Sequence, residues 1–129
     1  MAKVAAENGN KESATQYLKL ASTGRVREAF SRYVGPGFKH HVPYFEGTPE
    51  ALINGLEESG RQNPGKVFEI RRVVAEGDYV VTHSLVRQNA ADLGAVVVGI
   101  FRFKNGRIAE FWDVARPVQP SSPNENGLF

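Results

Sequence analysis

The sequence contains no cysteine, and this absence narrows the chemistry available to the chain. Disulfide bonds, thiolate metal sites and a cysteine nucleophile are all excluded. No apolar run approaches the roughly 20 residues that a membrane-spanning helix needs, and the opening MAKVAAENGNKES lacks the apolar centre of a signal peptide. Glycine-rich phosphate-binding motifs and the GxSxG motif of hydrolases are also missing. We therefore expect a cytoplasmic protein with no membrane partner.

The remaining composition is that of an ordinary globular protein. Of the 129 residues, 41% are hydrophobic and 23% charged, and the formal net charge is +2. This length suits one domain with one core. Basic and acidic residues are interspersed along the chain, so we expect no nucleic-acid partner. We assign residues 1–129 to a single domain, with an ordered core at about 10–117 and an irregular tail at 118–129 whose apolar end suggests docking.

Helical periodicity dominates the first half of the chain. Apolar residues at helical spacing predict helices over 14–22 and 25–34, the second ended by Gly35-Pro36-Gly37. Thr48-Pro49-Glu50 is a typical helix start, and it predicts a third helix that reaches about Arg61.

The second half of the chain alternates like β-strands. An extended segment over 38–45 is followed by predicted strands over 67–75 and 79–88 and by a hairpin over 95–116. Three helices followed by four long antiparallel strands predict an α+β fold in which the helices pack on one face of a curved, mainly antiparallel sheet. Such packing leaves room for a pocket between the two layers.

The hairpin over 95–116 is the most informative segment. Asn105-Gly106 lies between two β-rich runs, and this pair favours a two-residue hairpin turn because both positions need positive φ. The register set by that turn puts Asp113 on one face with Val96, Val98, Ile100, Phe111 and Ala115. A carboxylate among apolar neighbours is typical of a general acid or base. The alternative is a surface aspartate, or one paired with Arg72 or Arg102.

Three histidines are further candidates. His83 shares a predicted strand face with Tyr79, Val81 and Leu85, where it is either a core residue or an acid/base partner of the carboxylate. His40 and His41 are adjacent in an extended segment, so only one of them can easily face the pocket. Histidines and a carboxylate can also bind metal, but no H-x-H or HExxH spacing supports this, and we expect no metal.

Four segments of the chain carry a resemblance to a known family. They are FKHHVPY, FEIRRVVAEGDYVVTHS, VGIFRFKNGRIAEFWDVARPV and NENGLF. Together and in this order they resemble the SnoaL-like polyketide cyclases of the nuclear-transport-factor-2-like superfamily, in the branch of predicted aldol-condensation enzymes. The family pattern Y-x-Q-H-N-P corresponds to residues 38–43, where His41 matches the family histidine while His40 and Val42 replace the glutamine and the asparagine.

The resemblance implies a cone-shaped α+β fold, usually a homodimer, that works without cofactors. In the cyclases a late-strand aspartate moves a proton during aldol closure, and this role falls on Asp113, while His83 matches a histidine common in the branch. The outer sheet face, with Val97, Gly99, Phe101, Phe103, Ile108 and Trp112, is expected to meet the partner subunit.

We therefore predict a cofactor-independent cyclase or isomerase that abstracts a proton next to a carbonyl of a small apolar substrate. Asp113, His83 and His41 are the predicted catalytic residues. The predicted substrate-binding residues are Phe38, His40, Tyr44, Phe68, Val81, Leu85, Val98, Ile100 and Phe111. The alternative is a non-catalytic dimeric module that binds a small ligand, because this fold often has no catalytic role. Epoxide hydrolysis is less favoured, since no asparagine is expected near Asp113.

Overall fold

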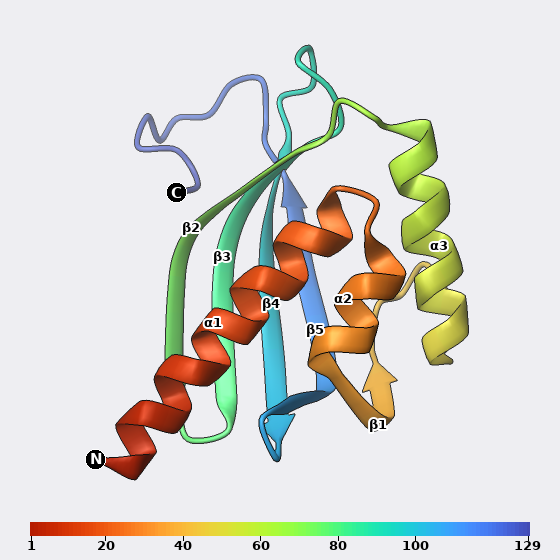
Figure 1. Ribbon diagram of the computed structural model, residues 1–129. Coiled ribbons are helices and arrows are strands. Elements are labelled where there is room, and N and C mark those ends of the chain that lie inside the picture. Colours follow the sequence, from red (N-terminus) through yellow and green to blue (C-terminus); the bar gives the residue numbers. More distant parts are fainter.

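A five-stranded sheet carries three helices on one face (Figure 1). The computed structural model describes all residues from Met1 to Phe129. The helices are α1 (Ala2–Ser22), α2 (Val26–Tyr33) and α3 (Pro49–Gln62). The strands are β1 (Val34–His40), β2 (Val67–Glu76), β3 (Tyr79–Arg87), β4 (Ala95–Lys104) and β5 (Arg107–Pro117). Their order in the sheet is β1-β5-β4-β3-β2, so the predicted α+β arrangement is confirmed.

The helix starts and ends follow local chemistry. The predicted start of α3 is confirmed, because the Thr48 hydroxyl accepts a hydrogen bond of 3.1 Å from the Ala51 amide, with Pro49 at the first helical position. Helix α1 begins at Ala2, well before the predicted start near Ala14. Only its second half is buried against the sheet, so its first half carries no apolar stripe to reveal it.

The segment after α2 differs from the prediction. Gly35-Pro36-Gly37 does end the helix, but it also forms the first part of β1, which pairs in parallel with β5. His40 lies opposite Phe111 in this pairing. The strand is irregular where the Gly-Pro-Gly sequence interrupts its register, and an irregular strand containing proline is typical of a sheet edge.

The hairpin of β4 and β5 contains a bulge that the turn alone does not reveal. Asn105 and Gly106 have φ of 52° and 77°, which confirms the turn. Phe103 pairs with Ile108 as predicted, but Arg102 pairs with Glu110, so Ala109 is an extra residue. Beyond this point each β4 residue faces opposite to the prediction. Val97, Gly99, Phe101 and Phe103 face the helices, whereas Val96, Val98 and Ile100 lie on the outer face.

A second irregularity sets the faces of β2 and β3. The register shifts between Ile70 and Arg72, so that Ile70 lies opposite Ser84 and Arg72 opposite His83. The side chains of β3 that are buried toward the helices are Val80, Thr82 and Ser84. His83 therefore lies on the outer face of the sheet.

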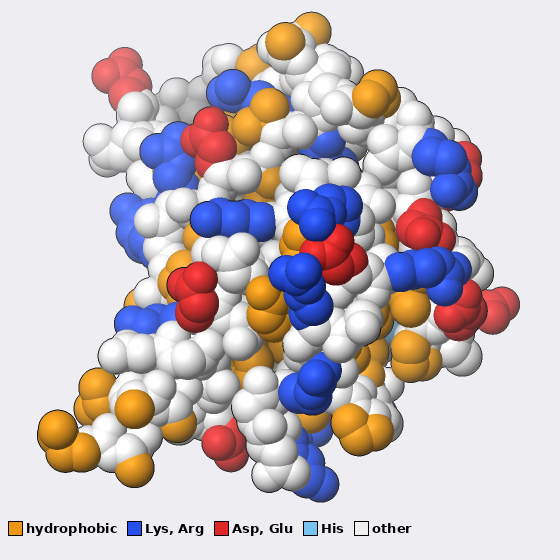
Figure 2. Space-filling model, in the orientation of Figure 1, with side chains coloured by type: hydrophobic (Ala, Val, Ile, Leu, Met, Phe, Trp, Pro, Cys, Tyr) orange, Lys and Arg blue, Asp and Glu red, His pale blue; other side chains and the backbone are white.

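The core lies between the helices and the inner sheet face. Its centre is aromatic, with Tyr17 edge-on to Phe101 at 6.0 Å and Phe30 edge-on to Phe38 at 5.6 Å between ring centroids. At the surface, the Arg27 guanidinium of α2 donates to Glu50 and Glu57 of α3 at 3.1 and 3.2 Å. Charges of both signs are interspersed over the helix-covered face (Figure 2). No helix is both long enough and apolar enough to cross a membrane.

Candidate functional site

A pocket of about 120 Å³ lies between the inner sheet face and helices α1 and α3. Most of its lining is apolar. The lining residues are Tyr17, Leu18, Ala21, Ser22, Val42, Leu52, Leu56, Gly60, Lys66, Phe68, Thr82, Val97, Gly99, Phe111 and Asp113. This set contains one carboxylate and one ammonium group. An apolar cavity with a few convergent polar groups is the usual form of a small-molecule site.

Asp113 of β5 is the carboxylate of the pocket. It is half-buried, and it forms neither an ion pair nor a hydrogen bond with another residue's side chain. Burial raises its pKa above the ordinary value, because the charged form loses solvation, while its own backbone amide and His40 act weakly in the opposite direction. A carboxylate in this state is suited to take up and return a proton.

Tyr17 of α1 and Thr82 of β3 bring hydroxyl groups to the same pocket. Tyr17 is 3% exposed, and its pKa is raised first by burial and then by the negative charge of Asp113. Both residues line the same pocket. Because its pKa is raised, the phenol stays protonated at neutral pH and can donate a hydrogen bond to a ligand oxygen.

Gly99 keeps the floor of the pocket open opposite Asp113, its partner in the β4–β5 pairing. A Cβ atom at this position would lie 2.8 Å from the Thr82 hydroxyl and 3.3 Å from the rings of Phe101 and Phe111. Any side chain at Gly99 would therefore crowd these neighbours and occupy space beside the carboxylate.

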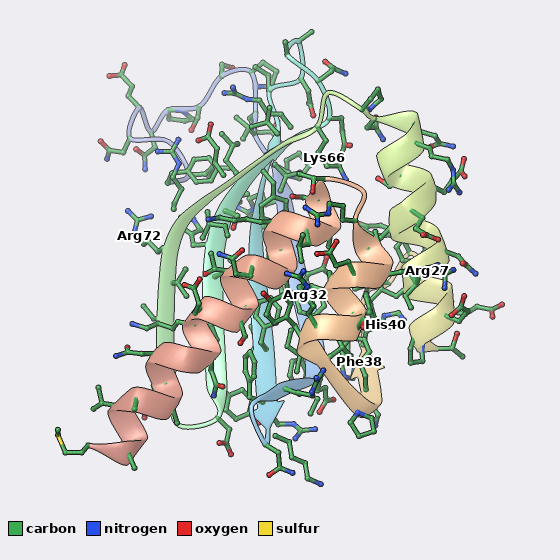
Figure 3. All side chains as sticks on the ribbon, in the orientation of Figure 1. Arg27, Arg32, Phe38, His40, Lys66 and Arg72 are labelled. Atoms are coloured by element: carbon green, nitrogen blue, oxygen red, sulfur yellow. The ribbon has the colours of Figure 1, made fainter.

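Lys66, in the segment between α3 and β2, contributes an ammonium group to the lining of the pocket. The Nζ atom donates a hydrogen bond of 3.1 Å to the Ser59 hydroxyl, and no carboxylate pairs with it. Partial burial lowers its pKa. Figure 3 shows Lys66 beside the C-terminal end of α1.

The structure confirms the predicted pocket location of three residues, namely Asp113, Phe111 and Phe68. Asp113 reaches the pocket although the predicted register of β4 was wrong. The bulge at Ala109 lies before Phe111 and Asp113 in β5. It changes which β4 residues lie beside them, while Phe111 and Asp113 themselves stay on the helix side of the sheet.

The predicted pocket location of His83 is wrong. The Arg72 guanidinium donates to its Nδ1 at 2.9 Å, and its Nε2 donates to the Leu128 carbonyl at 3.1 Å. The ring of Phe129 lies 5.4 Å away between centroids. His83 thus fastens the C-terminal tail to the outer face, and in Figure 3 Arg72 points away from the helices. The bulge in β2 and the alternation of β3 are the physical reason.

The adjacent histidines at the end of β1 occupy opposite sides of the sheet, as expected, but neither lies in the pocket. His41, predicted to be catalytic, is on the outer face, where it is 2.6 Å from the Glu110 carboxylate and stacks on Trp112. Its hydrogen bond is the main cause of the lowered pKa of Glu110.

His40 is buried, and both ring nitrogens are occupied by backbone groups. Nδ1 accepts from the Val42 amide at 3.2 Å, and Nε2 donates to the Glu46 and Thr48 carbonyls at 2.9 and 3.1 Å. This network assigns the Nε2–H tautomer, since carbonyls only accept. His40 is therefore a structural residue rather than a substrate-binding one.

Six other predicted substrate-binding positions fall outside the pocket. Phe38 is a core residue packed on Phe30, and Tyr44 is 77% exposed. Val81, Val98 and Ile100 lie on the outer face, on the side opposite to the prediction. Leu85 also lies on that side, where it is buried against Gly94. The register shifts explain the four strand residues, and the loop after β1 turns Tyr44 outward.

The pocket includes residues that the sequence analysis did not assign to it, chiefly Tyr17, Thr82, Gly99 and Lys66. Tyr17 belongs to an apolar helical stripe, a signal that predicts burial but does not distinguish core from pocket. Thr82 and Gly99 would have been assigned to the pocket if the opposite faces of β3 and β4 had been predicted to face the helices. Lys66 follows a Pro-Gly pair, and nothing in that sequence distinguishes it from a lysine in a solvated turn.

The structure contains no group of three or more histidine, aspartate or glutamate side chains placed to hold a metal ion. His40 faces inward, whereas His41 and His83 are on the outer face at separate places. The polar side chains that line the pocket are those of Asp113, Tyr17, Thr82, Lys66 and Ser22.

The fold and this pocket define the class of protein. The family model of the SnoaL-like domain matches residues 14–111, and the chain belongs to this family. Asp113 lies just beyond the matched residues. No curated protein sequence matches the chain significantly.

Solved structures with this fold include three informative neighbours. A SnoaL-like protein of unknown function from Burkholderia thailandensis is 16% identical, with a TM-score of 0.71 and coverage of 85% of this chain and 96% of that one. A candidate SnoaL-like polyketide cyclase from Jannaschia is 18% identical (TM-score 0.70, 84% and 86%). A candidate ketosteroid isomerase from Kribbella flavida is 14% identical (TM-score 0.70, 93% and 87%). These likenesses establish the cone-shaped nuclear-transport-factor-2-like fold.

Proposed function

We propose that the protein is a cofactor-independent cyclase or isomerase that moves a proton on the carbon next to a carbonyl group. The observation that carries this proposal is the unpaired Asp113 carboxylate in a mainly apolar pocket. An aspartate with no ion pair and no side-chain hydrogen bond accepts a proton readily, and such a group is suited to removing a proton from carbon.

The hydroxyl group of Tyr17 completes the proposed mechanism. When Asp113 removes the proton, negative charge develops on the carbonyl oxygen of the substrate. The phenol of Tyr17 donates a hydrogen bond to that oxygen and stabilises the enolate. The enolate carbon then attacks a second carbonyl in a cyclase, or it is reprotonated at another position in an isomerase. Protonated Asp113 returns the proton in either case. This account replaces the histidines of the sequence-based prediction with Tyr17.

The proposal is tested with 2,5-hexanedione in D₂O. Proton NMR follows the loss of hydrogen next to its carbonyls, and the same spectra report aldol closure followed by loss of water, which gives 3-methylcyclopent-2-enone. We expect the protein to accelerate exchange, and Asp113→Asn to reduce the rate at least about a hundredfold, the usual contribution of an acid/base group.

The matched control for this substitution is Glu69→Gln. Glu69 is an exposed β2 carboxylate whose ion pair with Arg71 contributes little, and it lies outside the pocket. Glu69→Gln is expected to keep the full exchange rate. If Asp113→Asn also keeps it, or if the unmodified protein is no faster than buffer, the proposal fails. A ligand that binds and returns unchanged would then favour a non-catalytic binding module.

We further propose that the protein is a homodimer that pairs through the outer sheet face. That face exposes apolar side chains on three strands, with Val74 60% and Val114 62% exposed and Tyr79 46% exposed. Exposed apolar area of this kind favours a partner. The observed β4–β5 register changes which residues are expected at this interface. Val96, Val98 and Ile100 lie there instead of the predicted Val97, Gly99 and Phe101.

A further inference from the structure

The pocket holds two opposite charges that do not pair with each other. Asp113 lies on the sheet, whereas Lys66 lies where α3 passes into β2, beside the end of α1 (Figure 3). Neither residue has a charged partner. A partly buried, unpaired ammonium group is costly unless something compensates for it. Both charges therefore point to a ligand with two different functional ends.

The backbone fixes Lys66 in its place. Asn63 caps the C-terminal end of α3 and its amide donates to the Ser59 carbonyl at 3.0 Å, while the Lys66 amide donates to the Asn63 carbonyl at 3.1 Å. Ser59 then holds the ammonium group at 3.1 Å. A single hydroxyl uses one of three donors, so two N–H groups remain for a ligand.

Size limits what can occupy the pocket. A cavity of about 120 Å³ is close to the roughly 150 Å³ that encloses benzene. The pocket is also partly open to solvent, so it suits a molecule of about six to eight non-hydrogen atoms, the longer ones reaching its mouth. A molecule this short that reaches from Asp113 to Lys66 has room for one carbonyl and one compact anionic group, and a carboxylate is the smallest common choice.

We infer that the substrate is a small keto acid whose carboxylate binds Lys66 and whose acidic carbon faces Asp113. This inference rests on the proposed function, and it names the substrate class of the same pocket. Lys66 binds the end of the substrate that does not react, so it determines specificity and positions the carbon acid. The lowered pKa of Lys66 agrees with burial at the pocket, and a bound carboxylate would raise it again.

Two probes of equal size test this inference. Levulinate and 2,5-hexanedione have the same number of non-hydrogen atoms and the same ketone, and they differ in carrying a carboxylate or an acetyl group. Calorimetric titration of both probes measures the preference. We expect levulinate to bind at least about tenfold more tightly, the scale of a hydrogen bond between charged groups.

Variants at Lys66 assign that preference to the ammonium group. Lys66→Met is expected to remove the preference and to leave 2,5-hexanedione binding within about twofold, whereas Lys66→Arg keeps it. Lys104→Met, an exposed lysine beside the β4–β5 turn, is the control and is expected to behave like the unmodified protein. Equal binding of the two probes, or a preference that persists in Lys66→Met, would overturn the inference.

The binding measurement separates this inference from the proposed function. Levulinate preference is expected to persist in Asp113→Asn, where proton exchange is lost. A preference without exchange would refute the catalytic proposal alone, whereas exchange that depends on Asp113 without any preference would refute the role of Lys66 alone. Borohydride treatment with levulinate is expected to leave Lys66 unmodified, and a reduced imine there would show a nucleophile instead of an anion-binding group.

Discussion

At the scale of single residues, the ionised Asp113 carboxylate serves the proposed activity but lowers the stability of the fold. Its pKa is raised in the folded protein above the ordinary value of about 4. As pH rises, the unfolded chain therefore loses this proton first, and the folded state becomes less stable through the interval between the two pKa values. At neutral pH the ionised, partly buried carboxylate destabilises the fold, a cost typical of catalytic groups.

Asp113→Asn is consequently expected to raise the thermal midpoint at pH 7 while it reduces the rate of proton exchange at least about a hundredfold. Near pH 3, where Asp113 is protonated in both states, the difference from the unmodified protein disappears. Calorimetry at the two pH values measures this, with Glu69→Gln as the control. A lower midpoint for Asp113→Asn at pH 7 would show that the carboxylate is stabilised by its surroundings.

The sequence identifies a functional residue reliably where the chemical character of that single position is unusual for its surroundings. Asp113 is identifiable because a carboxylate beside Phe111 has apolar neighbours whichever face of β4 lies next to it. Tyr17 and Lys66 could not be recognised in this way. A tyrosine in a helical stripe and a lysine in a turn have ordinary structural explanations, and only the assembled pocket shows that they line the same cavity as Asp113.

At the scale of elements, the extra residues of two β-bulges limited how well the sequence could predict which face of each strand lies toward the helices. The turn at Asn105-Gly106 and the cap at Thr48 are local, and both were predictable. The bulges at Ala109 and near Arg71 depend on how the sheet twists against its neighbours, and a one-residue shift moves a whole strand to the other face. This is why the elements were largely correct, whereas His83, Val98 and Ile100 were assigned to the wrong side.

His40 acts at this same scale, because it ties β1 to the start of α3. Replacing it leaves the Val42 amide and two carbonyls without their partner. His40→Ala is expected to lower the free energy of unfolding by about 2 kcal/mol or more. Urea denaturation checks this against His41→Ala, whose half-exposed pair with Glu110 contributes less than about 1 kcal/mol. Equal losses for the two variants would contradict the structural role of His40.

At the scale of the whole molecule, the outer sheet face is divided between two uses. The C-terminal tail covers the region around His83, where the Phe129 ring packs against His83 and the Arg71 guanidinium lies over that ring. The region around Trp112 and Val114 stays available for a second copy of the chain. The helix side encloses the pocket, so dimerisation on the opposite face would leave the pocket open.

The proposed dimer predicts a specific loss on mutation. Analytical ultracentrifugation is expected to show a dimer for the unmodified protein and a monomer for Val114→Glu, because a charge at the centre of an apolar interface loses its solvation. Val4→Glu, at a similarly exposed position on α1, is expected to remain dimeric. A monomer for the unmodified protein would contradict the proposed interface.

The central claim is that a partly desolvated Asp113 moves the proton, and the pH profile of 2,5-hexanedione exchange tests it most directly. Only the ionised carboxylate is a base, so the protein-catalysed rate is expected to rise with pH through a midpoint above the ordinary aspartate value of about 4 and then to level off. In Asp113→Asn this limb is expected to vanish. A midpoint at or below that value, or an unchanged profile in Asp113→Asn, would contradict the account.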